Sequence, residues 1–196
     1  ISHIKMGNRN VWGKSAEAIA LIEETRKSGF DITADAYPYT AWASTITVLV
    51  PSRKHDDRAE IEKGLSNVGG ADKVLVTNCP AHRDYEGKTL EQIAASQNTS
   101  PVDVYIEIVK DGGAGVVCNS MNKADVKAFY QQPWVMASSD GGLVAPGAGL
   151  PHPRSQGAFA RRLSHYVRGR GVLRLEDAIR GMTSLTAQVF ALQSSR

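Results

Sequence analysis

Residues 1–37 show the pattern of a parallel β-sheet, with two strands joined by a helix. The segment 15–27 has apolar side chains at helical spacing; Ser15 can cap its first turn and Gly29 can end it. Apolar residues at 1–4 precede it, and alternating apolar residues follow at 30–37. Because parallel neighbours need a long crossover connection, this order predicts one βαβ unit of an α/β fold.

The rest of the chain contains further predicted elements, less regularly spaced. Strands are expected at 45–50, 73–77, 115–118 and 134–138, and helices at 57–65, 89–95, 101–110, 123–130, 158–168, 174–182 and 186–192. We interpret residues 1–196 as one domain and about 50–130 as an inserted region that builds a substrate pocket, since such insertions occur on the βα loops of barrels.

The composition limits the possible functions. The 196 residues are 42% hydrophobic and carry a net charge of +3, with both signs mixed along the chain. This excludes a disordered chain and a broad nucleic-acid footprint, and no apolar run reaches the roughly 18 residues of a membrane span. A cytoplasmic location is expected. The arginines between 154 and 174 are interpreted as a solvated helical face. The sequence gives no indication of oligomeric state.

Asp140 is the first candidate for chemistry. It follows the apolar run 134–137 and precedes a glycine-rich loop, so it would lie at the carboxyl end of a strand. In barrel enzymes that end carries the active site, and an unpaired carboxylate in a closed site is costly. Asp-Gly is also a common turn signal, so a capping role is an equal alternative.

Other candidates lie beside predicted strand ends. His3 has the residue type of a zinc ligand, although a lone histidine there is more often structural. Arg154 and Lys5 could bind a substrate carboxylate, with a surface ion pair as the alternative. Tyr37 could donate to an anion or simply close a barrel mouth.

Seven short motifs, taken in order, resemble one family. They are SHIK at 2–5, NVWG at 10–13, DAYPYT at 35–40, SDG at 139–141, PHPR at 151–154, GAF at 157–159 and MTS at 182–184. Together they resemble the N-acyl-D-amino-acid deacylases (D-aminoacylases) of the amidohydrolase superfamily. The resemblance spans nearly the whole chain and is weakest between about 51 and 122.

The resemblance implies a fold and an activity. The fold would be the later part, about strands 6 to 8, of a distorted TIM-like (β/α)8 barrel. The activity would be zinc-dependent hydrolysis of an N-acyl-D-amino acid to a carboxylate and a free D-amino acid. The family's other metal ligands would precede Ile1, so we interpret the chain as a fragment that is inactive alone.

The resemblance also implies roles for individual residues. His3 would bind zinc, and Asp140 would act as the general base that takes a proton from water and returns it to the leaving amine. The substrate carboxylate would be held by Lys5, Tyr37 and Arg154. Arg53 is the candidate for side-chain specificity, and Ser44 and His152 are expected to support neighbouring site residues.

Two alternatives remain open. Another amidohydrolase could use the same barrel and metal on a cyclic amide or a dipeptide. A non-catalytic binding protein could also keep the barrel after losing the reaction. Carboxylate recognition by Lys5 and Arg154 would favour the deacylase, and loss of the upstream metal ligands would favour the binding protein.

Overall fold

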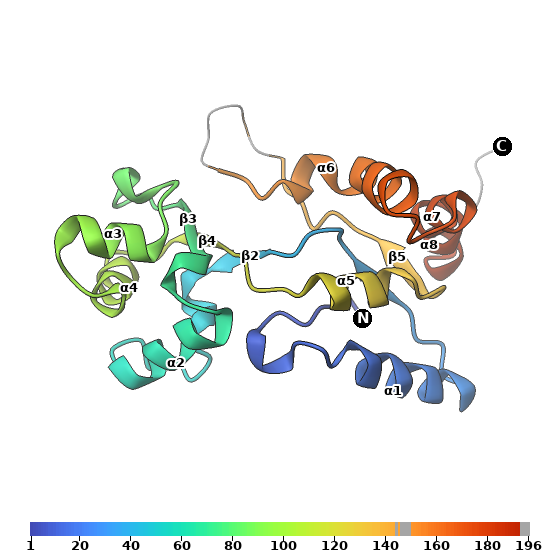
Figure 1. Cartoon of the computed structure of the whole chain (residues 1–196), viewed down its shortest axis with the longest axis horizontal. Helices are drawn as coiled ribbons and strands as arrows, with labels where there is room; N and C mark the ends of the chain where they lie inside the picture. The colour runs from blue at the N-terminus through green and yellow to red at the C-terminus, as the bar shows by residue number, and fades with distance from the viewer. Residues whose placement is uncertain (144, 146–149, 193–196) are drawn as a thin grey trace.

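The computed structural model describes residues 1–143, 145 and 150–192 and divides into two groups of elements (Figure 1). One group surrounds the strands β1 (Ala34–Ala36) and β5 (Val135–Ala137), and the other surrounds a three-stranded sheet. Residues 144 and 146–149, in the glycine-rich segment after Asp140, and residues 193–196 lie outside the described part.

Strands β1 and β5 are parallel neighbours, as a βαβ-type fold requires. Ala36 is level with Ala137, and the backbone N–H of Ser138 donates to the carbonyl of Ala36 at 3.0 Å. Both strands are shorter than predicted. Phe30 is 65% exposed, so the alternation that predicts a strand from residue 30 begins before the buried part of the sheet. The two carboxyl ends therefore meet at one edge.

Residues 1–4 do not form the predicted strand. Ile1 and Ile4 both pair with β1, because Asp35 N–H donates to the Ile1 carbonyl and Ile4 N–H donates to the Asp35 carbonyl. Between them His3 has a φ of 52°, in the left-handed region, which interrupts the extended backbone. The segment is thus bent at the histidine while remaining attached to the strand.

Seven helical segments accompany this pair of strands, and Figure 1 shows α1 and α5 on one side and α6 to α8 on the other. They are η1 (Arg9–Val11), α1 (Ser15–Lys27), α5 (Lys123–Tyr130), α6 (Arg154–Arg161), the π-helical η5 (Arg162–Gly169), α7 (Leu175–Met182) and α8 (Ser184–Val189). Their core includes Ile22, Ala34, Tyr130, Val135 and Tyr166. None of the helices in the described residues is long and apolar enough to cross a bilayer.

Helix α1 has the predicted bounds, but its cap is not the predicted one. The backbone N–H groups of Gly13 and Ser15 donate to the carboxylate of Asp125, at 2.9 and 3.3 Å. Asp125 lies on α5 and is 2% exposed. Ser15 is the first residue of the helix rather than its cap, and a buried carboxylate from a distant helix binds N–H groups at the start of α1.

Residues 42–118 form a second unit, here termed the insertion lobe. Its antiparallel sheet has the order β2 (Trp42–Thr45), β4 (Gly115–Cys118), β3 (Val74–Asn78). Its helical segments are η2 (Ile46–Leu49), α2 (Arg58–Val68), η3 (Ala71–Lys73), η4 (Arg83–Tyr85), α3 (Leu90–Gln97) and α4 (Pro101–Lys110). It has its own core, which includes Ile46, Ile61, Val76, Tyr105 and Ile108.

The predicted strand at 45–50 is wrong. The strand ends at Thr45, and Ile46 begins the 3-10 helix η2. Ile46 and Leu49 are both buried, which the 3-10 spacing of three residues achieves by placing them on one face. The segment whose β-branched residues predicted a strand therefore packs into the lobe core as a 3-10 helix.

Candidate active site

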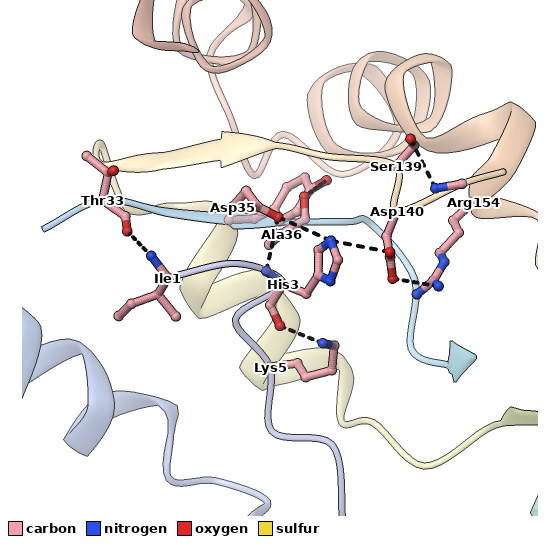
Figure 2. Close-up of polar contacts among 11 residues, drawn as sticks. Ile1, His3, Lys5, Thr33, Asp35, Ala36, Ser139, Asp140 and Arg154 are labelled. Atoms are coloured by element: carbon pink, nitrogen blue, oxygen red, sulfur yellow. Dashed lines mark hydrogen bonds and ion pairs between the residues drawn. The ribbon is translucent and has the colours of Figure 1, made fainter. Parts of the chain in front are cut away.

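The carboxyl ends of β1 and β5 bring together side chains from four parts of the sequence (Figure 2). Tyr37 follows β1, and Asp140 follows β5 after two serines. His3 lies on the segment attached to β1, and Arg154 begins α6. This is the edge at which α/β enzymes place their catalytic groups.

His3 and Asp140 form the centre of this cluster. The Nε2 atom of His3 lies 3.4 Å from Oδ1 of Asp140 and 3.9 Å from Oδ1 of Asp35. Asp35 also accepts a hydrogen bond from the His3 backbone N–H at 3.1 Å, which holds the bent backbone in place. One imidazole nitrogen thus faces two carboxylates, a set of donors suited to zinc.

Arg154 forms an ion pair with Asp140. Its Nη2 atom lies 2.5 Å from Oδ2 of Asp140, and its side chain is only 8% exposed. The loop after Asp140 passes close to α6, because a Cβ on Gly141 would lie 2.5 Å from the Ser155 Cα. Within the described residues, the polar contacts of Asp140 are with the side chains of His3 and Arg154.

Lys5 lies on the other side of His3. Its Nζ donates to the His3 carbonyl at 2.6 Å and lies 5.4 Å from the centre of the Tyr37 ring. Burial lowers the pKa of Lys5, and the positive charge of Arg154 acts in the same direction, while Asp140 opposes both. Lys5 and Arg154 therefore supply two cations to one partly buried site.

Tyr37 separates these two cations. The Arg154 guanidinium lies 4.7 Å from the ring centre, and Tyr37 is only 2% exposed. Burial raises the pKa of its hydroxyl to about 12. In the described part of the chain this buried hydroxyl has no hydrogen-bond partner. Because buried polar groups are normally paired, the hydroxyl is suited to a ligand that the site would receive.

His152 is hydrogen-bonded to the backbone of Arg154. The backbone N–H of Arg154 donates to Nδ1 of His152 at 3.0 Å, so Nε2 carries the proton and donates to the Ala41 carbonyl, also at 3.0 Å. The ring packs edge-on against Tyr37 and Tyr39. Burial lowers the pKa of His152, and the hydrogen bond from the Arg154 N–H joins the ring to the start of α6.

The structure does not bring every candidate to this cluster. Arg53 and Ser44 are exposed on the insertion lobe, and in the described residues neither has a polar contact with His3, Lys5, Tyr37, Asp140 or Arg154. Their roles stay predictions. Asp35 was missed as a site residue, although a carboxylate between two buried alanines of a strand was a usable signal.

A second cluster of side chains of the kinds that bind metal ions lies on the insertion lobe. Ligand atoms of His82, Glu107 and Asp111 lie within 4.8 Å of one another. His82 Nε2 lies 2.7 Å from Asp111, which is half exposed, and Glu107 accepts hydrogen bonds from the Tyr85 hydroxyl. These three side chains already have hydrogen-bond partners in the described residues.

Comparison with known proteins gives the same result as the motifs. The chain is 32% identical over 192 residues to N-acyl-D-glutamate deacylase from Alcaligenes xylosoxydans xylosoxydans, covering 98% of this chain and 35% of that protein. It is also 32% identical to D-aminoacylase from the same organism, with the same coverage. The resemblance to the N-acyl-D-amino-acid deacylases is confirmed. No family model matches the chain.

Solved structures of these deacylases share the fold. N-acyl-D-glutamate deacylase from Bordetella bronchiseptica, in complex with zinc and a phosphonate inhibitor, has a TM-score of 0.79 and 30% identity, over 98% of this chain and 36% of that one. A D-aminoacylase described with a binuclear metal centre has a TM-score of 0.77 and 35% identity, over 98% and 35%. The chain therefore spans about a third of the length of the deacylases that it matches.

Proposed function

We propose that this chain supplies the proton-transfer and substrate-binding groups of a zinc-dependent amidohydrolase that cleaves N-acyl-D-amino acids. The observation that carries the proposal is the contact of His3 with Asp140, at an edge that also holds Arg154 and Lys5. The similarity to D-amino-acid deacylases over 98% of the chain supports it. The products would be a carboxylate and a free D-amino acid.

The proposed fold is the later part of a (β/α)8 barrel. Residues 1–4, β1 and β5 would be its sixth, seventh and eighth strands, and they pair here in that spatial order. Residues 1–196 would form a partial barrel domain, with the inserted region at about 50–130 contributing to the substrate pocket. Other ligands of the metal would come from the rest of the barrel, so this chain alone is expected to be inactive.

The residues present fit a zinc ion. His3 Nε2 is directed toward the carboxylates of Asp140 and Asp35, and its backbone is held by Asp35. When bound, zinc would polarise the amide carbonyl and make a water molecule more acidic. His3 would hold the ion, and Asp35 would keep the imidazole in position.

Asp140 would move the proton. Its carboxylate takes a proton from the attacking water as the new C–O bond forms, and it then gives that proton to the nitrogen as the C–N bond breaks. The amine leaves neutral, and the acyl product is a carboxylic acid that then loses its remaining proton to solvent to become a carboxylate. In the present arrangement Arg154 neutralises Asp140, so a substrate carboxylate would first have to attract the guanidinium away.

Arg154, Lys5 and Tyr37 would bind the α-carboxylate of the substrate. The two cations lie against the ring of Tyr37, whose hydroxyl is unpaired in the described residues, and arginine can bind a carboxylate with two parallel hydrogen bonds. His152 would hold Arg154 in place. We keep Arg53 as the candidate for side-chain specificity and Ser44 as a supporting residue. The partner is a small molecule, and a cytoplasmic location stays a prediction.

The test uses the complete protein and its Asp140→Asn variant. Zinc content is measured together with hydrolysis of N-acetyl-D-methionine, N-acetyl-D-glutamate and their L-enantiomers. We expect bound zinc in both proteins, D-selective hydrolysis in the wild type, and a kcat about 10²–10⁴-fold lower in the variant.

Other outcomes would overturn the proposal in different ways. Bound zinc without hydrolysis of either enantiomer would point to a cyclic amide or dipeptide substrate. Absence of zinc together with absence of activity would favour a non-catalytic binding protein. D-selective hydrolysis that survives in Asp140→Asn would exclude Asp140 as the proton carrier.

A further inference from the structure

A cleft with a strongly positive lining lies between α5 and the α6–η5 helices. Its volume is about 400 Å³, and its lining includes Lys123 and Lys127 from α5, Arg161 at the end of α6, His165 from η5, and Arg170 directly after η5. The five basic side chains come from α5, from the end of α6 and from η5 with the residue after it, and they line one space. We call it the basic cleft.

The charge of the basic cleft is not balanced by acidic groups. Among its described lining residues none is a carboxylate, and the described residues show no ion pair for Lys123, Lys127, Arg161 or Arg170. The sequence from 154 to 175 contains no Asp or Glu. The one acidic residue of α5, Asp125, is buried against the amino terminus of α1.

The cations are close enough to affect one another. The pKa of His165 is lowered by burial and by the positive charges of Arg161, Arg170 and Lys123. Like charges held together repel, and the repulsion is only partly screened by salt. An anion bound in the cleft would offset this repulsion between the basic side chains. A solvated helical face, as expected from sequence, does not explain why two different helices direct their cations into one cleft.

The remaining lining indicates the size and kind of anion. Pro38, Tyr166 and Val172 provide an apolar surface beside the cations. Small-molecule sites have volumes of roughly 300–1,000 Å³ and combine apolar walls with a few polar groups. We propose that the basic cleft binds a small phosphorylated anion, with its phosphates between the lysines and arginines and its organic part against Tyr166 and Val172.

This proposal is independent of the deacylase activity. Arg161 belongs to the cleft, but its Nε donates to the Pro38 carbonyl at 2.8 Å and its guanidinium lies 5.0 Å from the centre of the Tyr39 ring. Because these contacts position the loop after Tyr37, Arg161 is left unchanged in the test. Lys127 and Arg170 are exposed cleft residues outside the candidate active site, so they are the ones to replace.

The experiment is a calorimetric titration of the complete protein with inorganic pyrophosphate, with phosphate and acetate as comparison anions. The double variant Lys127→Ala/Arg170→Ala is compared with Lys63→Ala/Lys110→Ala, which removes the same charge from exposed positions on α2 and α4. We expect pyrophosphate to bind the wild type and the control with one site. The cleft variant should bind at least about tenfold more weakly, since two phosphate contacts are lost.

Several other results would overturn the proposed anion site. Equal weakening in both double variants would show a general effect of net charge and overturn the proposal. Pyrophosphate binding that is unaffected in the cleft variant would place the anion elsewhere. Acetate binding as tightly as pyrophosphate would exclude selectivity for phosphate, and absence of binding in the wild type would refute the site. Thermal unfolding of each variant confirms that it is folded.

Discussion

His3 and Asp140 meet at 3.4 Å although they come from opposite parts of the sequence, and each has a left-handed backbone. Their φ angles are 52° and 47°, a conformation that side-chain-bearing residues adopt rarely. Such strain costs on the order of 1–3 kcal/mol per residue and persists only where surrounding contacts enforce it. The bond from His3 N–H to Asp35 and the Asp140 ion pair with Arg154 supply those contacts.

Replacing Arg154 by lysine should separate binding from chemistry. Lysine keeps the charge but cannot form two parallel hydrogen bonds with a carboxylate, and each charge-assisted bond contributes about 1.5–3 kcal/mol. We expect KM for N-acetyl-D-methionine to rise about tenfold or more with little change in kcat. Steady-state kinetics of the complete protein measure both. Arg168→Lys, exposed on η5, is the control and should leave both unchanged.

Removing the Tyr37 hydroxyl should weaken substrate binding without destabilising the fold. The hydroxyl is buried and unpaired, so Tyr37→Phe relieves a desolvation cost of about 1–3 kcal/mol. We expect the free energy of unfolding in urea to stay equal or increase, while KM rises.

Tyr130→Phe is the matched comparison for Tyr37→Phe. The Tyr130 hydroxyl is also buried but donates to the Ala36 carbonyl at 3.3 Å. Its removal should therefore decrease the free energy of unfolding by about 1 kcal/mol. A loss of stability in Tyr37→Phe as large as that in Tyr130→Phe would contradict the assignment of Tyr37 to substrate.

His152 should make stability depend on pH. Its folded pKa is lower than the usual 6.5, mainly through burial, so the unfolded chain binds a proton at higher pH than the folded one. Its contribution to stability is therefore present above about pH 6.5 and is lost as the pH falls toward the folded pKa. Urea unfolding between pH 7.5 and 5.5 measures the slope, and His152→Gln should reduce it. An identical slope in the variant would exclude His152 as the source.

Asp125→Ala should destabilise the protein by about 1–3 kcal/mol, because it leaves two N–H groups at the start of α1 without their acceptor. Asp84→Ala, at an exposed position in η4, should have little effect. Chemical unfolding measures both. If Asp125→Ala lowers the free energy of unfolding by less than about 0.5 kcal/mol, which is the range of ordinary surface substitutions, water must replace the carboxylate as the acceptor.

Local patterns predicted some elements well. The bounds of α1, α4, α5 and β4 agree with the sequence expectation, because each has clear periodicity and a terminating or capping residue. The cap of α1 could not be found this way, since Asp125 acts across the fold. The conformation of Ile46–Leu49 is likewise set by burial in the lobe core.

In the candidate site too, local sequence patterns predicted some features, and contacts across the fold determine the others. Position beside strand ends or in the adjoining loops was enough to select His3, Lys5, Tyr37, Asp140 and Arg154 as candidates, and the fold brings them together. The ion pair between Arg154 and Asp140 and the bond of His152 to Arg154 depend on where α6 begins relative to β5. The basic cleft depends on the packing of α5 beside η5, which no linear pattern contains.

Trp42 and Cys118, at the two ends of the insertion lobe, are paired residues of neighbouring antiparallel strands. Antiparallel partners have Cα atoms roughly 4.5–5.5 Å apart, so the chain leaves the site-bearing strands and returns to them at almost the same place. The lobe is therefore attached to the site-bearing part through two adjacent points of the chain. The lobe is one contiguous piece of sequence, and the strands β1 and β5, which Tyr37 and Asp140 follow, both lie outside it.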